Sequence, residues 1–476
     1  MINYNKLGFK AGIEVHQQLS GRKLFCDCPT IISKEESDFS LHRVLRASAG
    51  ESGLVDKAAA HEVEKSKQFV YEGYNNITCL VEADEQPPKE ASEDALITAL
   101  TMAKLLNIKV NDCIQFMRKT VIDGSNTSGF QRTALIGENG WITIDGKKFG
   151  IESLCLEEEA CQVIERTETK DKYNLSRLGI PLLEIATAPD MHTPEEVKKV
   201  AGHIGMLLRS LDGLKRGIGS IRQDVNVSIE KGARVEIKGF QDIKSIPKVI
   251  NFEVDRQLKL VKESKNVVSE VRKAEPDFST TYLRPMPGSD RMYPETDVSL
   301  INPDVYDIIV PKTLDEKTRE LEEKFSLSEN LASEAMKYSS KSSSEDVDIF
   351  KLLEDYVSEN LSANELVDTA LYKLDNVTKK IGSKPSIDLD DLFREVSKGS
   401  IAAGSIDKIL EDSCKKNIDL SDYMKLDESK LEGIVDEVVS ENKNASTGAL
   451  MGLIMKQTKG KADGKEVMSL LKKKLN

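Results

Sequence analysis

Two short segments in the middle of the chain carry the residues whose types and spacing point most directly to chemistry. Residues 222–229 and 234–238 alternate apolar with polar side chains, which in a β-strand point to opposite faces. We therefore predict a hairpin, with a loop at 230–233, that has one apolar and one polar face. Carboxylates and cationic groups at alternate positions suit a site for phosphate and a divalent metal better than an ordinary solvated face, which is the alternative. The polar positions in question are Arg222, Asp224, Asn226, Glu236 and Lys238.

Acids and one histidine in three other segments extend this interpretation. Residues 12–16 alternate in the same way, and residues 156–159 and 182–185 place glutamates among apolar neighbours. A buried glutamate needs a partner, and a single one is more often salt-bridged than catalytic. Several glutamates together with a histidine favour a Mg²⁺ site, because Mg²⁺ takes a few carboxylates plus water and phosphate oxygens, and an imidazole can supplement them. These residues are Glu14, His16, Glu157, Glu158 and Glu184.

A polar loop bracketed by glycines, residues 123–132, follows the basic pair Arg118-Lys119. Its backbone N–H groups could bind phosphate as anion nests do, although the loop matches neither the Walker A pattern nor the kinase glycine loop. An ordinary turn is the alternative. We expect Arg118 and Lys119 to contribute to the binding of a nucleotide's phosphates.

The cysteines point to a compartment rather than to a disulfide framework. Seven of them, an odd number, are scattered over 476 residues, which indicates a reducing cytosol. Cys26 and Cys28 invite a zinc interpretation, but zinc needs four ligands, usually from two closely spaced pairs. The remaining cysteines form no such pair, so structural zinc is the less favoured alternative.

The composition limits the partners of the chain. A net charge of −13 argues against non-specific coating of nucleic acid, so any RNA contact must be a local basic patch. Residues 444–476 hold seven lysines against two acids, and a solvated helix end is the alternative there. The N-terminus lacks a signal-peptide profile and no run approaches the ~18 apolar residues of a membrane span, so we expect a cytoplasmic protein without membrane contact. The lysines expected to meet RNA are Lys456, Lys459 and Lys461.

The elements that must position these residues change character along the chain. Up to about residue 307 the sequence is rich in Gly, Pro and short alternating runs, and from about residue 311 it has helical spacing and few prolines. In the first part we predict one helix at 92–106 and another that Thr193 caps, with Pro194 and Glu196 completing a capping box. Further strands are predicted near residues 13–16, 116–122, 141–144 and 182–185.

We therefore predict an α+β fold that begins with a mixed sheet and continues as helices. A second change at the Gly-rich segment 399–404 gives three domains, in line with the usual size of roughly 150 residues each. Their predicted bounds are 1–308, 309–405 and 406–476.

Taken in order, several segments resemble the GatB/GatE family of tRNA-dependent amidotransferases, and the agreement extends over nearly the whole chain. Within that family, residues 84–88 and 118–133 are similar to the archaeal E branch rather than the bacterial B branch. The segments that carry the resemblance are 12–19, 23–29, 156–160, 181–185, 219–226, 235–238, 293–297 and 449–452.

One segment departs from the E-branch pattern. That branch usually carries a large insertion, similar to one in bacterial aspartyl-tRNA synthetases, before the segment 283–288. Here only a short charged run at about 262–275 stands in its place. The tRNA contacts that the insertion would provide are therefore not expected of this chain.

The resemblance implies a cradle-shaped domain with a mixed or antiparallel sheet, an all-α middle domain and a small, helical YqeY-like tail that meets the tRNA. It implies that Glu-tRNA(Gln) is converted to Gln-tRNA(Gln): ATP phosphorylates the γ-carboxylate of the glutamyl group, and ammonia displaces the phosphate. In the E branch the ammonia would come from an asparaginase-like amidase, the D-type partner. In the B branch it would come from a Ser-Ser-Lys amidase, the A-type partner, accompanied by a small C-type protein.

The family pattern also implies roles for single residues. His16, Glu157 and Glu184 match the Mg²⁺ ligands, and further acids, Glu14, Glu158 and Glu236, are expected close by. We assign Asp224 and Asn226 to metal or phosphate support. The positive charges expected on the phosphates of ATP are Arg118, Lys119, Arg222 and Lys238.

Two alternatives remain open. The chain could be a tRNA-binding scaffold without its own ATP site, although a scaffold has no reason to bury several acids and a histidine together. It could also be a bacterial, B-type protein that acts on Glu-tRNA(Gln) or Asp-tRNA(Asn). An amidase gene of the D or the A type beside this one would separate the two branches.

Overall fold

The computed structural model describes residues 3–46, 67–240, 242–286, 292–339, 348–442, 445–458 and 461–475. These residues form two compact units, Met1–Thr313 and Leu314–Asn476, which have separate hydrophobic cores.

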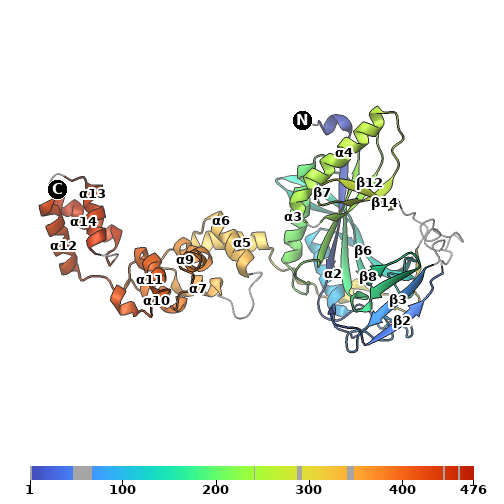
Figure 1. Ribbon diagram of the computed structural model, residues 1–476, viewed down its shortest axis with the longest axis horizontal. Helices are drawn as coiled ribbons and strands as arrows, with labels where there is room; N and C mark the ends of the chain where they lie inside the picture. Colours follow the sequence, from blue (N-terminus) through green and yellow to red (C-terminus); the bar gives the residue numbers. More distant parts are fainter. Residues whose placement is uncertain are drawn as a thin grey trace. The chain divides into compact units, whose positions relative to one another are not determined.

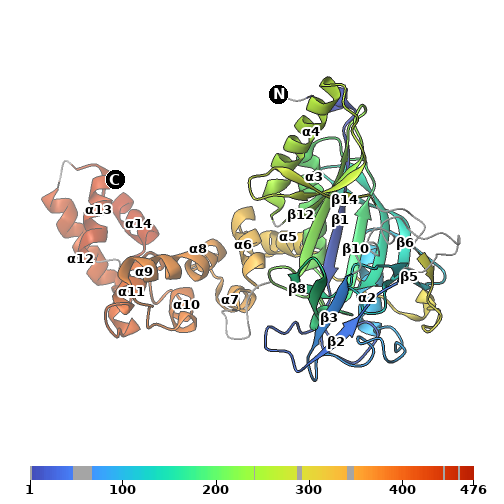
Figure 2. The same ribbon diagram turned by 45° about the vertical axis from the view of Figure 1, so that its right-hand side comes forward.

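A large sheet forms the centre of the first unit (Figures 1 and 2). Eleven of the described strands make up this sheet, in the order β14-β13-β12-β11-β1-β10-β7-β6-β5-β15, with β4 paired to β6. All neighbours whose register is known pair antiparallel except β12 and β13, so the sheet is mixed. The strands are β1 (Lys10–Gln18), β4 (Lys109–Val110), β5 (Phe116–Thr120), β6 (Phe130–Ile144), β7 (Lys147–Glu158), β10 (Pro181–Thr187), β11 (Ile221–Ser228), β12 (Val235–Phe240), β13 (Glu270–Ala274), β14 (Thr280–Pro285) and β15 (Met292–Pro294).

A smaller sheet has the strand order β2-β3-β9-β8. Its strands are β2 (Phe39–Arg43), β3 (Gln68–Gly73), β8 (Gln162–Arg166) and β9 (Lys170–Asn174). Tyr71 and Tyr173 stack at its centre, fully buried, with ring centroids 5.8 Å apart.

Three α-helices accompany the large sheet: α2 (Glu93–Leu105), α3 (Pro194–Arg209) and α4 (Ile246–Lys262). Helix α2 packs on β6 and β7, and α3 packs on β1 (Figure 1). The cap predicted at Thr193 is confirmed, because its Oγ1 accepts a hydrogen bond from Glu196 N at 3.2 Å. The Glu196 carboxylate reaches back to the N–H of His192 instead of that of Thr193. Short 3₁₀ helices lie at Asn5–Leu7, Leu175–Arg177, Ile243–Ser245 and Pro303–Val305.

The predicted hairpin is present as β11 and β12, and the strands predicted at 13–16, 141–144 and 182–185 fall within β1, β6 and β10. The strand predicted at 116–122 is present as β5, which ends two residues earlier, at Thr120. One expectation was wrong at its edge, because the polar loop predicted at 123–132 ends before Phe130. Residues 130–132 pair with β5, so Phe130 begins a strand of 15 residues. Pairing with a neighbouring strand has prevailed over the polar local composition.

Strand β1 has one apolar and one polar face. Ile13 and Val15 are buried in the main hydrophobic core, whereas Glu14 and His16 point to the opposite side. Since directly paired residues share a face, the pairing of β1 with β10 and β11 puts further polar residues beside them. The helices cover the apolar face, and the polar face carries the candidate site described below.

The second unit contains helices. A middle cluster buries Leu353, Leu366, Phe393 and Ile406, and a separate cluster near the C-terminus buries Val435, Ile454 and Leu471. The α-helices are α5 (Leu314–Phe325), α6 (Glu329–Ser339), α7 (Ile349–Tyr356), α8 (Ala363–Asp368), α9 (Leu374–Ile381), α10 (Leu389–Ser397), α11 (Ile406–Ser413), α12 (Glu428–Glu441), α13 (Thr447–Gln457) and α14 (Gly464–Leu475), with shorter helical turns at Thr369–Lys373, Ala403–Ser405 and Leu420–Tyr423.

The predicted succession of a mixed α and β region and a helical region is confirmed. The three domain bounds proposed from the sequence remain predictions. Within the described residues, every helix is too short or too polar to traverse a lipid bilayer.

Candidate active site

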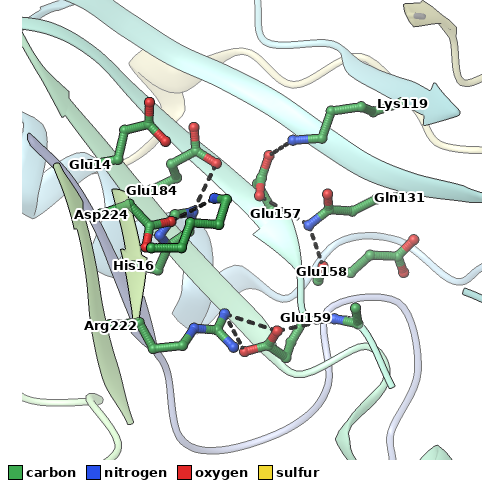
Figure 3. Close-up of polar contacts among 12 residues, drawn as sticks. Glu14, His16, Lys119, Gln131, Glu157, Glu158, Glu159, Glu184, Arg222 and Asp224 are labelled. Carbon is green, nitrogen blue, oxygen red and sulfur yellow. Dashed lines mark hydrogen bonds and ion pairs between the residues drawn. The ribbon is translucent and has the colours of Figure 1, made fainter. Parts of the chain in front are cut away.

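Three side chains that are far apart in the sequence meet near the centre of the large sheet. His16 on β1 is the direct partner of Glu184 on β10, and its Nε2 lies 3.2 Å from Glu184 Oε2. Glu157, near the end of β7, joins them, so that ligand atoms of all three residues lie within 4.8 Å of one another (Figure 3). One imidazole and two carboxylates form a donor set that suits a divalent cation. That these residues bind a metal remains a prediction.

Glu157 is held through both of its carboxylate oxygens. Lys119 Nζ donates to Oε1 at 2.7 Å, and Gln131 Nε2 donates to Oε2 at 3.0 Å (Figure 3). Burial and the charge of Glu184 raise the pKa of Glu157 above its ordinary value, against the opposing charge of Lys119. Gln131 was not assigned a role from the sequence. Its pairing with Lys119 across β5 and β6 is the signal that would have found it.

His16 and Glu184 stabilise opposite charges on each other. Burial alone would raise the pKa of Glu184, but the hydrogen bond from His16 and the charge of Lys119 hold it well below its ordinary value. Burial lowers the pKa of His16, and the hydrogen bond and charge of Glu184 more than reverse this, so the net shift is upward. A metal that binds Nε2 must compete with the hydrogen bond between His16 and Glu184.

A second group lies one step along β1, where Glu14 pairs with Asp224 on β11. Ligand atoms of Glu14, Asp224 and Glu236 lie within 4.8 Å of one another. Lys238 Nζ donates to Asp224 Oδ2 at 2.7 Å and also pairs with Glu236, and these charges raise the pKa of Lys238 to about 12 despite its burial. Burial, with Glu236 and Glu184 nearby, raises the pKa of Glu14.

A β-bulge lies in β12 beside Lys238. Between the pairs Gln223–Phe240 and Val225–Ile237, strand β12 has one residue more than β11. Gly239 takes φ +89° in this stretch, a conformation that favours glycine. Lys238 keeps the alternation with Glu236 and lies on the polar face beside Asp224.

Arg222 pairs with His16 across β1 and β11, at the other end of the group. Its guanidinium contacts Glu159, with Nη2 2.9 Å from Oε2 and 3.0 Å from Oε1 (Figure 3). Gln18 Nε2 donates to the same carboxylate at 2.9 Å. Glu159 and Gln18 were not among the predicted site residues, although together they fix the place of a half-exposed cation beside His16.

Asn226 links this group to a further arginine. Its Nδ2 donates to Glu14 Oε1 at 3.0 Å, and its Oδ1 accepts from Arg234 Nε at 3.0 Å. Asn226 thus connects Glu14 with Arg234, and its supporting role for a metal or phosphate remains a prediction.

Arg118 does not join the group. It is adjacent to Lys119 in β5, so its side chain points to the opposite face of the sheet. There it pairs with Glu295 and, at 3.1 Å, with Asp297. The expectation that Arg118 faces the phosphate site together with Lys119 is corrected, because neighbouring residues of a strand cannot share a face.

Glu158 is corrected for the same reason. It follows Glu157 in β7 and turns away from it, and its Oε1 accepts from the backbone N of Arg132 at 2.9 Å and lies 3.4 Å from Arg132 Nη1. Glu158 belongs to an ion network on the side of the sheet opposite the candidate site.

The loop at 123–129, part of the segment predicted as a phosphate-binding loop, makes interior contacts. Asn126 and Thr127 are 1% and 3% exposed, and Thr127 Oγ1 donates to the carbonyl of Glu82 at 2.6 Å. The carbonyl of Ser125 accepts from Cys161 N at 2.8 Å. These contacts favour a structural role for the loop.

Cys26 and Cys28 have partners that the sequence spacing did not reveal. Ligand atoms of Cys79 and Glu82 lie within 4.8 Å of both thiols and of each other. Burial and the Glu82 charge raise the pKa of Cys26, and they raise that of Cys28 to about 12, so both are thiols at neutral pH without a metal. Glu82 also pairs with the fully buried Lys23 at 2.7 Å.

The lysines expected to contact RNA lie near the end of α13. Lys456 is exposed in its last turn, and Lys461 is partly buried after it. Lys459 lies outside the described residues.

Comparison with known proteins finds similarity along nearly the whole chain. Residues 9–306 match the GatB/GatE catalytic domain, and residues 349–475 match the GatB domain. The chain is 34% identical to a relative from Archaeoglobus fulgidus and 35% identical to one from Methanocaldococcus jannaschii, with all of this chain and 99% of each relative covered. A relative from Methanosarcina barkeri is 33% identical, with 100% of this chain and 98% of the relative covered. All three are named as the E-type subunit of glutamyl-tRNA(Gln) amidotransferase.

The alignment with the Archaeoglobus relative spans 625 positions, which is 149 more than the 476 residues of this chain. The relative therefore contains a substantial amount of sequence that has no counterpart here, as the absence of the E-branch insertion predicts. In the structure α4 ends at Lys262 and β13 begins at Glu270, so a connection of a few residues occupies that region. With a catalytic-domain match over more than half of its length and full-length relatives above 30% identity, the chain belongs to the GatB/GatE family.

Proposed function

We propose that this chain is the synthetase-type subunit of a glutamyl-tRNA(Gln) amidotransferase, a ligase that converts Glu-tRNA(Gln) to Gln-tRNA(Gln) at the expense of ATP. The observation that carries this proposal is the convergence of His16, Glu157 and Glu184 beside Lys119, on the polar face of the sheet. The names of the full-length relatives support the same reaction.

The reaction needs an activated acyl group, because a carboxylate is a poor electrophile. Transfer of the γ-phosphoryl group of ATP to the side-chain carboxylate of the glutamyl group gives an acyl phosphate and ADP. Ammonia then attacks the acyl carbon, and inorganic phosphate leaves. For such steps a protein contributes mainly positioning and neutralisation of phosphate charge.

His16, Glu157 and Glu184 would hold Mg²⁺, which when bound supplies positive charge to the phosphate oxygens. The donor set fits, because Mg²⁺ accepts one or two carboxylates and leaves room for phosphate oxygens and water. The hydrogen bonds from Lys119 and Gln131 hold the Glu157 carboxylate in place for this task.

Positive side chains surround the same face. Lys119 and Lys238 are paired with acids, so they are fixed in position, and Arg222 is fixed by Glu159. We assign phosphate binding to these three, with Asp224 and Asn226 in support. Glu236, which pairs with Lys238, and the nearby Glu14 would keep Lys238 in place beside a cation.

The ammonia must come from a partner. Cys155 lies on this face opposite Glu184, and burial together with the charge of Glu184 raises its pKa, so it is a thiol rather than the thiolate that a cysteine nucleophile requires. We therefore propose that the partner is an asparaginase-like amidase of the D type. The E-type names of the relatives favour it over the A-type and C-type partners of a bacterial complex.

We further propose a division of labour along the chain. Residues 1–308 would form the cradle that holds ATP, Mg²⁺ and the aminoacyl end of the tRNA, and 309–405 a helical connection. Residues 406–476 would form the tail that binds tRNA, with Lys456, Lys459 and Lys461 on the phosphates.

The test is Glu184→Ala in the chain purified with its amidase partner. Glu-tRNA(Gln)-dependent ATP hydrolysis and Gln-tRNA(Gln) formation should both fall by at least about a hundredfold, with tRNA binding retained. Glu138→Ala, at an exposed position of β6, is the matched control. Unchanged turnover in Glu184→Ala would leave the passive scaffold as the remaining interpretation.

A further inference from the structure

A loop between α3 and β11 presents an isoleucine fully to solvent. Ile218 is 110% exposed, more than any other large apolar side chain among the described residues. Gly217 and Gly219 flank it with φ of +102° and +87°, a backbone conformation that favours glycine. Single exposed apolar residues are common on protein surfaces, so what this one does depends on its surroundings.

Both stems of the loop are fixed to the end of β1. Lys215 N donates to the carbonyl of Gln18 at 3.0 Å, and Gln18 N donates to the carbonyl of Ser220 at 2.9 Å. Leu214 and Ser220 are buried, whereas residues 216–219 are exposed. The loop therefore has anchored stems and an exposed tip just beyond the strand that carries His16.

The segment around this tip is basic, although the whole chain has a net charge of −13. Arg216 donates through Nη2 to the carbonyls of Arg209 at 3.2 Å and Leu211 at 3.1 Å, so its guanidinium is held beside the tip. Glu159 offsets the charge of Arg222. A local excess of positive charge suits the phosphates of a nucleic acid. Between residues 209 and 222 the cations are Arg209, Lys215, Arg216 and Arg222, and the acid is Asp212.

An apolar side chain next to cations is a combination that proteins use on stacked bases. Apolar residues such as isoleucine pack against base steps, while arginine and lysine bind the backbone phosphates. The last base pair of an RNA duplex exposes a flat face where the stack ends. Because Ile218 projects singly from a narrow tip, it matches such a duplex end.

The position of the tip fits the proposed substrate. Ile218 and Arg222 are four residues apart, and Arg222 is the direct partner of His16 in the sheet. Four residues of chain span at most about 14 Å. In an aminoacylated tRNA a single strand of about four nucleotides joins the last base pair to the amino acid, and it spans about 14 Å when stacked. A duplex end at Ile218 would therefore bring the glutamyl group to the site at His16.

We propose that the loop at 213–220 receives the acceptor end of the tRNA, with Ile218 packed on the last base pair and Arg216 on the adjoining phosphates. This inference rests on the tRNA substrate proposed above. It adds the element that separates the duplex from the single strand that enters the site.

The first experiment measures binding of an RNA hairpin that contains the acceptor stem of tRNA(Gln) and its single-stranded 3′ end. Fluorescence anisotropy gives the Kd for the chain assembled with its amidase partner. Ile218→Asp should raise the Kd by about tenfold or more, because a carboxylate neither packs on a base pair nor tolerates nearby phosphates. Ile218→Leu, which keeps an apolar tip, should bind like the wild type. Ile309→Asp, at another apolar residue that is 82% exposed, is the control and should leave the Kd unchanged.

The second experiment moves the end of the duplex. In a blunt hairpin a complementary 5′ extension pairs with the 3′ strand, so the last base pair lies several steps further out. The wild-type chain should bind this blunt hairpin more weakly than the hairpin with a free 3′ end. Ile218→Asp should bind the two hairpins with similar affinity.

The third experiment tests the phosphate contact. Arg216→Ala should reduce the slope of log Kd against log salt by about one, the value for one lost phosphate contact. Lys231→Ala, at an exposed position in the loop between β11 and β12, is the control and should retain the wild-type slope. An unchanged slope in Arg216→Ala would remove this contact from the proposal.

The outcomes separate this proposal from the proposed function. Equal Kd values of wild type and Ile218→Asp, or equal affinity of the wild type for the two hairpins, refute the acceptor-end contact alone. Loss of the amidase partner from Ile218→Asp in size-exclusion chromatography, with RNA binding unchanged, also overturns it, since the tip would then contact protein. A wild-type assembly that forms no Gln-tRNA(Gln) refutes the proposed function.

Discussion

His16 and Glu184 face each other across two antiparallel strands, and their side chains form a hydrogen-bonded pair with opposite pKa shifts. Neither pKa shift follows from the residue's own segment of sequence, because the groups that cause it lie on other strands. The pair forms because β1 and β10 are neighbours in the sheet. Glu157 joins the two residues from β7, the strand on the other side of β10. The same geometry that holds the two side chains together by a hydrogen bond would provide two ligands for a divalent cation.

Replacement of His16 tests the ligand set directly. His16→Ala removes one donor and leaves Glu184 without its hydrogen bond, so Mn²⁺, used as a paramagnetic substitute for Mg²⁺, should bind at least about tenfold more weakly. Electron paramagnetic resonance titration measures the free ion. His192→Ala, a histidine whose ring contacts the carbonyl of Phe9 away from the cluster, is the control and should bind Mn²⁺ normally. Equal affinity of His16→Ala and wild type would remove His16 from the metal site.

Gln131 should act through Glu157. Gln131→Leu keeps the side-chain volume similar but removes the hydrogen bond to Glu157 Oε2, so the carboxylate loses one of its two anchors. We expect about a 10- to 100-fold loss in Mg²⁺ affinity or in turnover, the usual effect of a residue that orients a metal ligand. The dependence of turnover on Mg²⁺ concentration distinguishes this from misfolding, because saturating Mg²⁺ should restore much of the activity. Gln162→Leu on exposed β8 is the control.

Glu295 should make stability depend on acidic pH. Its buried carboxylate accepts from Arg118 and from Arg132 Nε at 2.6 Å, and despite burial these arginines lower its pKa to about 2. Since the folded pKa lies below the unfolded value of about 4.5, the stabilisation is complete above that pH and is lost as the pH falls toward 2.

Glu295→Gln should therefore reduce the free energy of unfolding by about 3 kcal/mol at pH 7. Urea denaturation should show a smaller difference from wild type at pH 4 than at pH 7. A difference that does not change between these pH values would mean that the carboxylate charge is not what stabilises this network.

The cysteine cluster should respond to metal. If Cys26, Cys28, Cys79 and Glu82 bind zinc, the purified chain should contain about one equivalent by elemental analysis, and removal by a chelator should lower its Tm by several degrees. Cys79→Ser should lose the metal, whereas Cys113→Ser, an exposed cysteine, should retain it. A chain without bound zinc that is unaffected by chelators would leave these groups as an ordinary buried network around Glu82.

The basic end of the chain should contact tRNA electrostatically. Replacing Lys456 and Lys461 together with alanine should weaken tRNA binding and reduce the slope of log Kd against log salt by about two, one unit for each phosphate contact. Lys379 and Lys380, exposed lysines on α9, provide the matched double replacement. Deletion of residues 444–476 should weaken tRNA binding further and leave assembly with the amidase intact. An unchanged salt slope would place the RNA contact elsewhere.

Much of the candidate site could be predicted from the sequence, because alternation along a strand is a local property. The polar faces of the hairpin and of β1 follow from the residues themselves, and so does the cap at Thr193. The grouping of His16, Glu157 and Glu184 required the family resemblance, because nothing in their separate segments states which strands will be neighbours.

The remaining features of the site depend on the tertiary structure, because the sequence of one segment does not state which strand will lie beside it. Strand order sets which residues share a face across neighbouring strands, and it brought Gln131 and Glu159 to the site. Bulges shift the register by one residue, and the one at Glu152 in β7 gives its side chain a direction that alternation alone would not. Hydrophobic patterning acts over a few residues, whereas the pairing of β1 with β10 and β11 joins segments more than a hundred residues apart.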